Sequence, residues 1–159
     1  MRYFTMAWWQ GVQEGLTENP HDDYFASVAA LRGRVPPERL PAWDALLGLG
    51  LHDSTLLHLR LDPAAATLHI RLDNRYTQAR CTLAYTGVEQ FTSQPDPVGG
   101  FSSHGFGDLG YDEVDLSPTG ALIHRVLFAS GIELEVVFRG FEFLPVHPAE
   151  PGTAADGEA

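Results

Sequence analysis

Residues 55–73, TLLHLRLDPAAATLHIRLD, decide the fold of this chain. Apolar and polar side chains alternate on both sides of the segment Pro63-Ala64-Ala65-Ala66, a period of two that is typical of strands with one buried face and one wet face. The stretch therefore predicts a β-hairpin with its apolar face made by Leu57, Leu59, Leu61, Leu68, Ile70 and Leu72. Pairing of Asp62 with Thr67 sets two cross-strand pairs of basic side chains, His58 with Arg71 and Arg60 with His69.

The same period of two continues to the end of the folded part. It predicts further strands at about 80–86, 111–116, 121–128 and 132–138. Two aromatic residues, Phe141 and Phe143, fall out of phase with the last of these strands, which predicts a β-bulge at Arg139-Gly140.

Before residue 50 the apolar spacing is helical. Thr5 and Asn19 are residues that cap helix N-termini, and they predict two helices that end near Gly15 and Gly33. A short third helix is predicted from Pro41 to Leu47.

These patterns predict an α+β protein. We expect a single domain over residues 1–144, with two or three N-terminal helices (5–48) packed on a five- to six-stranded antiparallel sheet (54–144) that is half-barrel or sandwich-like. Residues 145–159 hold three prolines, two glycines and three carboxylates, and we expect a disordered acidic tail there.

The charge of the chain excludes several function classes. Of 159 residues, 10 are basic and 21 are acidic, so the net charge is −11 at pH 7, and every basic residue is an arginine. Chemistry that needs a lysine amine is therefore absent, and the acidic balance argues against nucleic acid as a partner. Residues 93–144 hold eight carboxylates against two arginines. We expect an acidic surface there that attracts a protein partner with a basic surface.

The sequence shows neither a secretory signal nor an apolar stretch long enough to span a membrane, and we expect a cytoplasmic protein without membrane attachment. The absence of lysine beside abundant arginine, alanine and glycine is typical of GC-rich codon usage, which points to a bacterial source. The single cysteine, Cys81, is in phase with Leu83 and Tyr85, and we expect it to be a small core residue.

The glycine-rich segment 93–110 is long for an ordered connection, and it is either a plain hairpin connection or a contact surface. Its letters Gly105–Gly110 match G-x-G-x-x-G, but three carboxylates follow where a phosphate-binding helix is needed, so no dinucleotide cofactor is expected. On the first helix, Trp9 either packs between the helices and the sheet or lies in an exposed binding patch. The candidate partner-binding residues are Trp9, Phe101, His104, Phe106, Asp108, Asp112 and Glu113.

Catalytic and metal patterns are not found. The seven histidines form no H-E-x-x-H motif and the acidic run matches no EF-hand loop, so no metal site is expected. His52-Asp53 is a poor dyad because neighbouring strand residues point to opposite faces, and we expect Asp53 or Ser54 to stabilise a turn. The sequence therefore favours a protein that is not an enzyme.

The polar face of the hairpin is the second candidate site. Arginine suits bidentate contacts to carboxylate or phosphate, so a concave face would hold a small anion. The four candidate ligand-binding residues are His58, Arg60, His69 and Arg71.

The chain opens Met1-Arg2-Tyr3-Phe4-Thr5 with tryptophans soon after, and Leu51-His52-Asp53 precedes the alternating strands. These pieces resemble a bacterial domain-of-unknown-function family whose members open Met-Lys/Arg-Tyr-Phe-Thr. The basic residue that such members often carry after the threonine is Met6 here. The resemblance implies a small bacterial α+β protein and no particular activity.

We expect a non-catalytic protein-interaction module of immunity or inhibitor type whose partner has a basic surface. The alternative is a curved β-sheet domain that binds a small anion. Self-association into a homodimer is also left open.

Overall fold

The computed structural model describes residues 1–74, 76–102 and 104–146. The described chain has three α-helices and eight strands, so the predicted α+β class is confirmed. The helices are α1 (Met6–Gln13), α2 (His21–Arg32) and α3 (Leu40–Leu47), with a short 3-10 turn at Pro37–Arg39 before α3. The strands are β1 (Ser54–Asp62), β2 (Thr67–Asn74), β3 (Ala79–Thr86), β4 (Gln90–Pro95), β5 (Leu109–Leu116), β6 (Leu122–Phe128), β7 (Ile132–Phe138) and β8 (Gly140–Val146).

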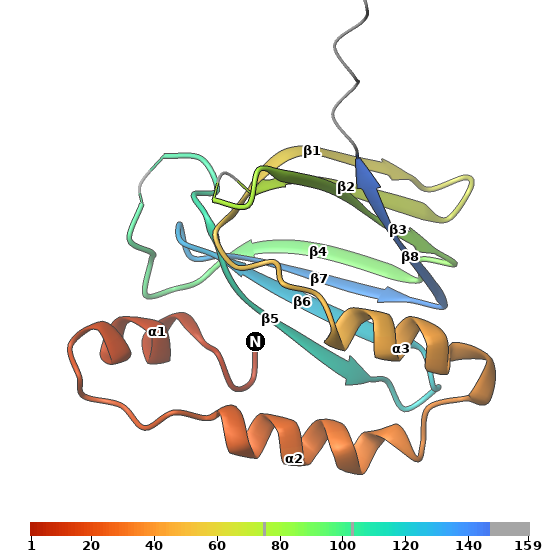
Figure 1. Ribbon diagram of the computed structural model, residues 1–159, viewed down its shortest axis with the longest axis horizontal. Helices are drawn as coiled ribbons and strands as arrows, with labels where there is room; N and C mark the ends of the chain where they lie inside the picture. The colour runs from red at the N-terminus through yellow and green to blue at the C-terminus, as the bar shows by residue number, and fades with distance from the viewer. Residues whose placement is uncertain (75, 103, 147–159) are drawn as a thin grey trace, which may run out of the picture.

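The strands form two antiparallel four-stranded sheets that face each other, which agrees with the sandwich-like alternative, whereas the predicted number of five or six strands was wrong. Sheet A has the order β1-β2-β3-β8 and sheet B the order β4-β7-β6-β5. Helices α1 and α2 lie on the side of sheet B, α3 also contacts β8, and no helix of the described chain covers the outer face of sheet A (Figure 1). Among the described residues, no helix has the length and apolar character needed to cross a bilayer.

The chain passes from one sheet to the other at two adjacent corners. One corner joins β3 to β4, and the other joins β7 to β8 at Arg139. Backbone hydrogen bonds connect them, from Arg139 N–H to Thr86 O (3.1 Å) and from Glu89 N–H to Val137 O (2.8 Å). The predicted bulge at Arg139-Gly140 is therefore wrong. Phe141 is out of phase with β7 because it belongs to a strand of the other sheet, where it pairs with Tyr85.

The hairpin of β1 and β2 has the predicted register, with His58 opposite Arg71 and Arg60 opposite His69. A bulge at Leu57 shifts the phase of β1, so that Leu56 rather than Leu57 pairs with Leu72. The Leu57 side chain is consequently 49% exposed instead of buried as predicted.

The core lies between the two sheets and under the helices. It joins the inner faces of β2 and β3 with those of β6 and β7, where Leu134, Val136 and Phe138 of β7 are buried. A smaller cluster fills the space between α1 and the outer face of sheet B, and it consists of Met6, Trp9 and Leu127.

Two segments differ from their sequence interpretation. The segment 93–110 begins inside β4 and ends inside β5, which leaves a shorter connection than predicted. Its backbone is attached to the β6–β7 turn, since the N–H groups of Phe101 and Ser102 both donate to Ala129 O. The predicted tail begins inside β8, where Pro145 pairs with Cys81. The remaining residues of that prediction, 147–159, lie outside the described part of the chain.

Candidate functional site

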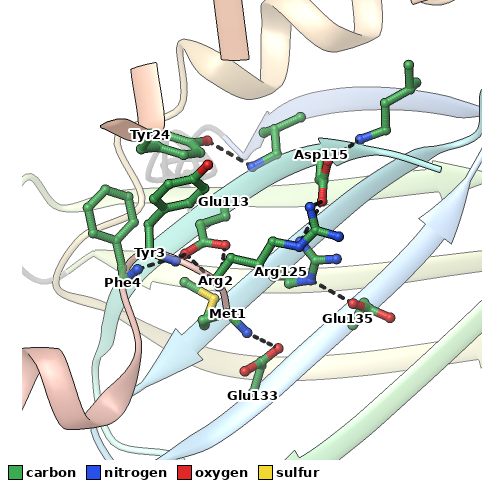
Figure 2. A network of polar contacts seen from close by, with 12 residues as sticks. Met1, Arg2, Tyr3, Phe4, Tyr24, Glu113, Asp115, Arg125, Glu133 and Glu135 are labelled. Atoms are coloured by element: carbon green, nitrogen blue, oxygen red, sulfur yellow. Dashed lines mark hydrogen bonds and ion pairs between the residues drawn. The ribbon is translucent and has the colours of Figure 1, made fainter. Parts of the chain in front are cut away.

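The N-terminal segment is attached to sheet B by a buried carboxylate. Glu113 on β5 is 1% exposed, and its carboxylate accepts the backbone N–H groups of Arg2 (2.8 Å), Tyr3 (2.7 Å) and Phe4 (2.8 Å). Hydrogen bonds to a charged acceptor are stronger than those between neutral groups, so this cluster holds the segment firmly against the sheet. Figure 2 shows the carboxylate facing the three N–H groups.

Beside this cluster, Arg125 on β6 connects two more carboxylates. Its guanidinium binds Glu135 at 2.7 Å and Asp115 at 3.1 Å, and Asp115 also pairs with Arg2 (Figure 2). Burial lowers the pKa of Arg125, but the hydrogen bonds and charges of Glu135 and Asp115 outweigh burial and raise the pKa above its usual value. Arg125 therefore stays charged and fixes both carboxylates.

The acidic run of β5 is thus turned inward rather than presented to a partner. Glu113 and Asp115 are buried, and Trp9 is only 9% exposed with its ring against Gly110. Trp9 and Glu113 are accordingly buried, so that their side chains offer little surface for contacts with another protein. Of the two predicted alternatives, Trp9 therefore packs between helix and sheet and does not lie in an exposed patch.

The fixed N-terminal segment forms one wall of a cavity of about 270 Å³, which we call the aromatic cavity. The other walls come from α2, from the end of α3 with the connection to β1, and from the start of β5. The lining residues are Phe4, His21, Tyr24, Phe25, Leu46, Leu47, Leu49, Gly50, Leu51, His52, Gly110, Tyr111 and Asp112.

Aromatic rings dominate the walls of this cavity and hold one another in place. Phe4 is stacked on Tyr111 with ring centroids 5.4 Å apart, and it meets Tyr24 edge-on at 5.2 Å. The His52 ring meets Tyr111 edge-on at 5.6 Å. Edge-to-face and offset contacts are the favourable arrangements of such rings, so the cavity wall is pre-formed.

Among the described residues that line the aromatic cavity, Asp112 is the only acidic one. Its Oδ2 atom lies 3.1 Å from His124 Nε2, and His124 Nδ1 lies 2.8 Å from the Tyr85 hydroxyl. Burial raises the pKa of Tyr85 well above its usual value, so its hydroxyl keeps its proton. The Asp112 carboxylate can only accept, so His124 Nε2 donates to it while Nδ1 is hydrogen-bonded to the Tyr85 hydroxyl. This chain of hydrogen bonds fixes the Asp112 carboxylate from behind.

His52 and Asp53 form a contact that the sequence analysis did not expect. Asp53 has a positive φ of 63°, which turns its side chain back toward its neighbour, so that Oδ1 lies 2.9 Å from His52 Nδ1. The argument from alternating strand faces was wrong here because the pair precedes β1. The Asp53 N–H donates to Leu109 O at 2.8 Å, which attaches this turn to the start of β5, and the turn role expected of the Asp53 or Ser54 side chain stays a prediction.

Carboxylates lie near both tyrosine hydroxyls of the cavity. The pKa of Tyr24 is raised, first by burial and then by the charges of Asp112, Glu113 and Asp115, although its hydrogen bond with the Val114 N–H acts in the opposite direction. The pKa of Tyr111 is likewise raised by burial and by the charge of Asp53. Both hydroxyls feel neighbouring carboxylates, and such a field favours a cation as ligand.

Of the predicted partner-binding residues, only Asp112 lines this cavity. Phe101 is exposed and meets Trp9 edge-on at 5.0 Å, whereas Phe106 packs against Phe128. His104 and Asp108 are exposed on the connection between β4 and β5. The sequence analysis missed Phe4, Tyr24 and Tyr111 as site residues because their meeting depends on the docked N-terminal segment.

The candidate anion-binding residues lie on the uncovered outer face of sheet A. The side chains of His58, Arg60, His69 and Arg71 are all exposed, and none of them lines either cavity next to α3. An anion bound there stays in contact with bulk solvent.

No cluster of three or more metal-ligating side chains is found within residues 1–74, 76–102 and 104–146. Cys81 is half-buried rather than fully buried in the core. Neither models of known protein families nor curated proteins match this chain, so the resemblance of its opening residues stays a prediction.

Proposed function

We propose that this protein is a non-catalytic interaction domain for a partner with a basic surface, and that the aromatic cavity receives an arginine or lysine side chain of that partner. The observation that carries the proposal is the Asp112 carboxylate, fixed by His124 in the wall of a cavity lined by aromatic rings.

A cationic side chain fits this chemistry in two ways. Aromatic faces attract cations, by about 0.5–2 kcal/mol per contact depending on how far the site is desolvated. Asp112 adds a charge-assisted hydrogen bond, because only its Oδ2 atom is hydrogen-bonded among the described residues and Oδ1 is available to a guanidinium. Arginine presents a planar fork that can stack on a ring and bind a carboxylate at the same time.

A catalytic role is less well supported by the same lining. Among the described residues around the cavity, none is a serine, threonine, cysteine or lysine, so none of them offers an aliphatic hydroxyl, thiol or amine as a nucleophile. The His52–Asp53 pair has the geometry of a general base, but both side chains are about half exposed to solvent. Binding without turnover is the simpler use of these residues.

The experiment is an NMR titration of the full chain with N-acetyl-arginine amide, using N-acetyl-citrulline amide as the neutral isostere. We expect amide shifts at His52, Tyr111 and Asp112 with the cation, and a dissociation constant of about 1 mM, as suits a single side chain. The neutral isostere should shift these signals little at the same concentration.

Asp112→Asn is the matching variant, because an amide oxygen can still accept the His124 proton while the charge is lost. We expect its affinity for the arginine probe to fall about tenfold. Glu142→Gln removes an exposed carboxylate on β8 that does not line the cavity, and should leave the affinity unchanged. Equal affinities for the two probes, or an Asp112→Asn variant that binds the arginine probe as tightly as the unmodified chain, would disprove the proposal.

A further inference from the structure

A second cavity, of about 410 Å³, lies at the other side of the connection between α3 and β1. We call it the end cavity, because its floor is the inner face of sheet A where β1 begins and β2 ends. Its lining residues are Ala45, Gly48, Leu49, Gly50, Leu51, Ser54, Asn74, Thr77, Ala79, Arg80, Cys81, Phe143 and Pro145.

The strand register explains why the floor of the end cavity is largely apolar. Cys81 pairs with Pro145, and Leu83 pairs with Phe143, so these positions share the inner face of the sheet. Helix α3 contacts β8 at this end of the face but leaves part of it open, and Phe143 is 42% exposed. The fold thus leaves an apolar surface with lining residues around it and an open space between them.

One polar group in the cavity has unused hydrogen-bonding capacity. Ser54 is only 3% exposed, and its Oγ atom receives a single long hydrogen bond, from Asn74 Nδ2 at 3.5 Å. Among the described residues its hydroxyl hydrogen has no acceptor. Asn74 is already committed, since its amide donates to His52 O at 2.9 Å and accepts the N–H groups of Tyr76 and Thr77.

The charge of the lining favours a neutral ligand. Arg80 is the only charged residue among the described lining residues, and its Nε atom is paired with Asp73 at 3.2 Å. Every other lining side chain is apolar or an uncharged polar group.

We propose that the end cavity binds a small neutral molecule with an apolar body and one hydrogen-bond acceptor, such as a medium-chain ketone or ester, whose oxygen accepts the Ser54 hydroxyl. The volume lies within the range of small-molecule sites and, at about 30 Å³ for each water-sized group, holds on the order of ten to fifteen non-hydrogen atoms. The proposal does not rest on the function proposed for the aromatic cavity, which takes a cation.

Cys81 provides the readout, because it is the single cysteine of the chain and lines the end cavity. The full-length protein is modified with methyl methanethiosulfonate in the presence of rising concentrations of 2-heptanone or 2-nonanone. We expect protection of Cys81 that saturates with ketone concentration. The binding affinity of 2-nonanone should exceed that of 2-heptanone on the order of tenfold, since each buried methylene raises the affinity roughly fourfold. No protection up to the solubility limit of 2-nonanone would overturn the proposal.

Two variants assign the site. Ala79→Leu fills the end cavity and should abolish protection by the ketones, with thermal unfolding as the check that the variant is folded. Equal protection in this variant and in the unmodified chain would overturn the proposal.

Ser54→Ala should weaken the binding of 2-nonanone at least threefold. It should leave the binding of 1-chlorononane, which lacks a good hydrogen-bond acceptor, unchanged. An equal loss for both probes would overturn the role of Ser54.

A second copy of the chain is the competing occupant, given the exposed Phe143. Cys81 modification without any probe should therefore be independent of protein concentration. A rate that falls as the protein concentration rises, together with a dimer in sedimentation, would assign the cavity to an interface between copies and overturn the proposal.

Discussion

The carboxylate of Glu113 on β5 accepts the backbone N–H of Phe4 at 2.8 Å, although 109 residues separate the two in the sequence. Phe4 in turn stacks on Tyr111, two residues before Glu113 on the same strand. The N-terminal segment and the aromatic cavity are therefore one structural unit, and the carboxylate that holds the segment also shapes the candidate site.

Replacing Glu113 by glutamine should lower the free energy of unfolding by about 2–4 kcal/mol. The carboxylate accepts three backbone N–H groups, and a glutamine offers one neutral oxygen and turns an NH₂ group toward donors. Urea unfolding followed by tryptophan fluorescence measures the change. Glu142→Gln, at an exposed position, is the control and should change stability by less than about 0.5 kcal/mol. Equal stabilities of the two variants would contradict this account of the N-terminal segment.

Tyr85→Phe should cost about 1–3 kcal/mol, because it removes the hydroxyl that is hydrogen-bonded to His124 Nδ1 and leaves a buried ring nitrogen without its partner. The same variant should reduce the affinity of the aromatic cavity for the arginine probe only modestly, since His124 still donates to Asp112. Chemical denaturation gives the stability, with Tyr76→Phe as the control because Tyr76 is 80% exposed. If Tyr76→Phe loses as much stability as Tyr85→Phe, the hydrogen bonds from Tyr85 through His124 to Asp112 do not stabilise the fold.

The stability of the protein should fall above about pH 10. Tyr24 and Tyr85 have pKa values raised mainly by burial, so they keep their protons in the folded state while the same side chains ionise near pH 10 in the unfolded state. The unfolded state then binds fewer protons, and each such tyrosine lowers stability by up to about 1.4 kcal/mol per pH unit until its folded pKa is reached.

Urea midpoints at several alkaline pH values measure this slope, and tyrosinate absorbance reports ionisation directly. Phenylalanine at position 24 or 85 should make the slope shallower. A slope that is the same in both variants and in the unmodified chain would show that these tyrosines are not its cause.

Gly100→Ala should destabilise the protein by about 1–3 kcal/mol, because a Cβ atom at this position overlaps the backbone of Ser130 and Gly131. The connection between β4 and β5 would have to leave the β6–β7 turn, where the Phe101 N–H now donates to Ala129 O at 2.7 Å. Thermal unfolding measures the loss. Gly33→Ala, where the added Cβ meets open space, should be nearly neutral. Similar melting temperatures for Gly100→Ala and the unmodified chain would show that this connection is not attached as described.

Local pattern was sufficient to predict the central hairpin but not the arrangement of the sheets. The pairs His58–Arg71 and Arg60–His69 follow from the turn between Asp62 and Thr67. The passage of β7 into β8 through Arg139 was interpreted as a bulge, because a change of phase looks the same whether a strand bulges or changes sheets. Only the pairing of β8 with β3 distinguishes the two.

The site was predicted less well than the fold, for a physical reason. Charged residues on a strand are usually solvated, so the acidic run around Glu113 was interpreted as a docking surface. Its burial depends on backbone N–H groups of the N-terminal segment and on Arg125, and no local pattern reveals partners so far away. Asp112 is the one predicted residue that does line the aromatic cavity.

The hydrogen bond between the Val114 N–H and the Tyr24 hydroxyl has a consequence for the whole molecule. β5 is the last strand of sheet B, so its outward backbone groups would otherwise be open to a strand from another molecule. Tyr24 occupies one of them at 2.8 Å. On sheet A, the last strand β8 carries Pro145, which has no N–H to offer, and the first strand β1 is bent by its bulge at Leu57. The remaining edge strand, β4, ends in Pro95, so each of the four sheet edges carries a feature that discourages the addition of a further strand.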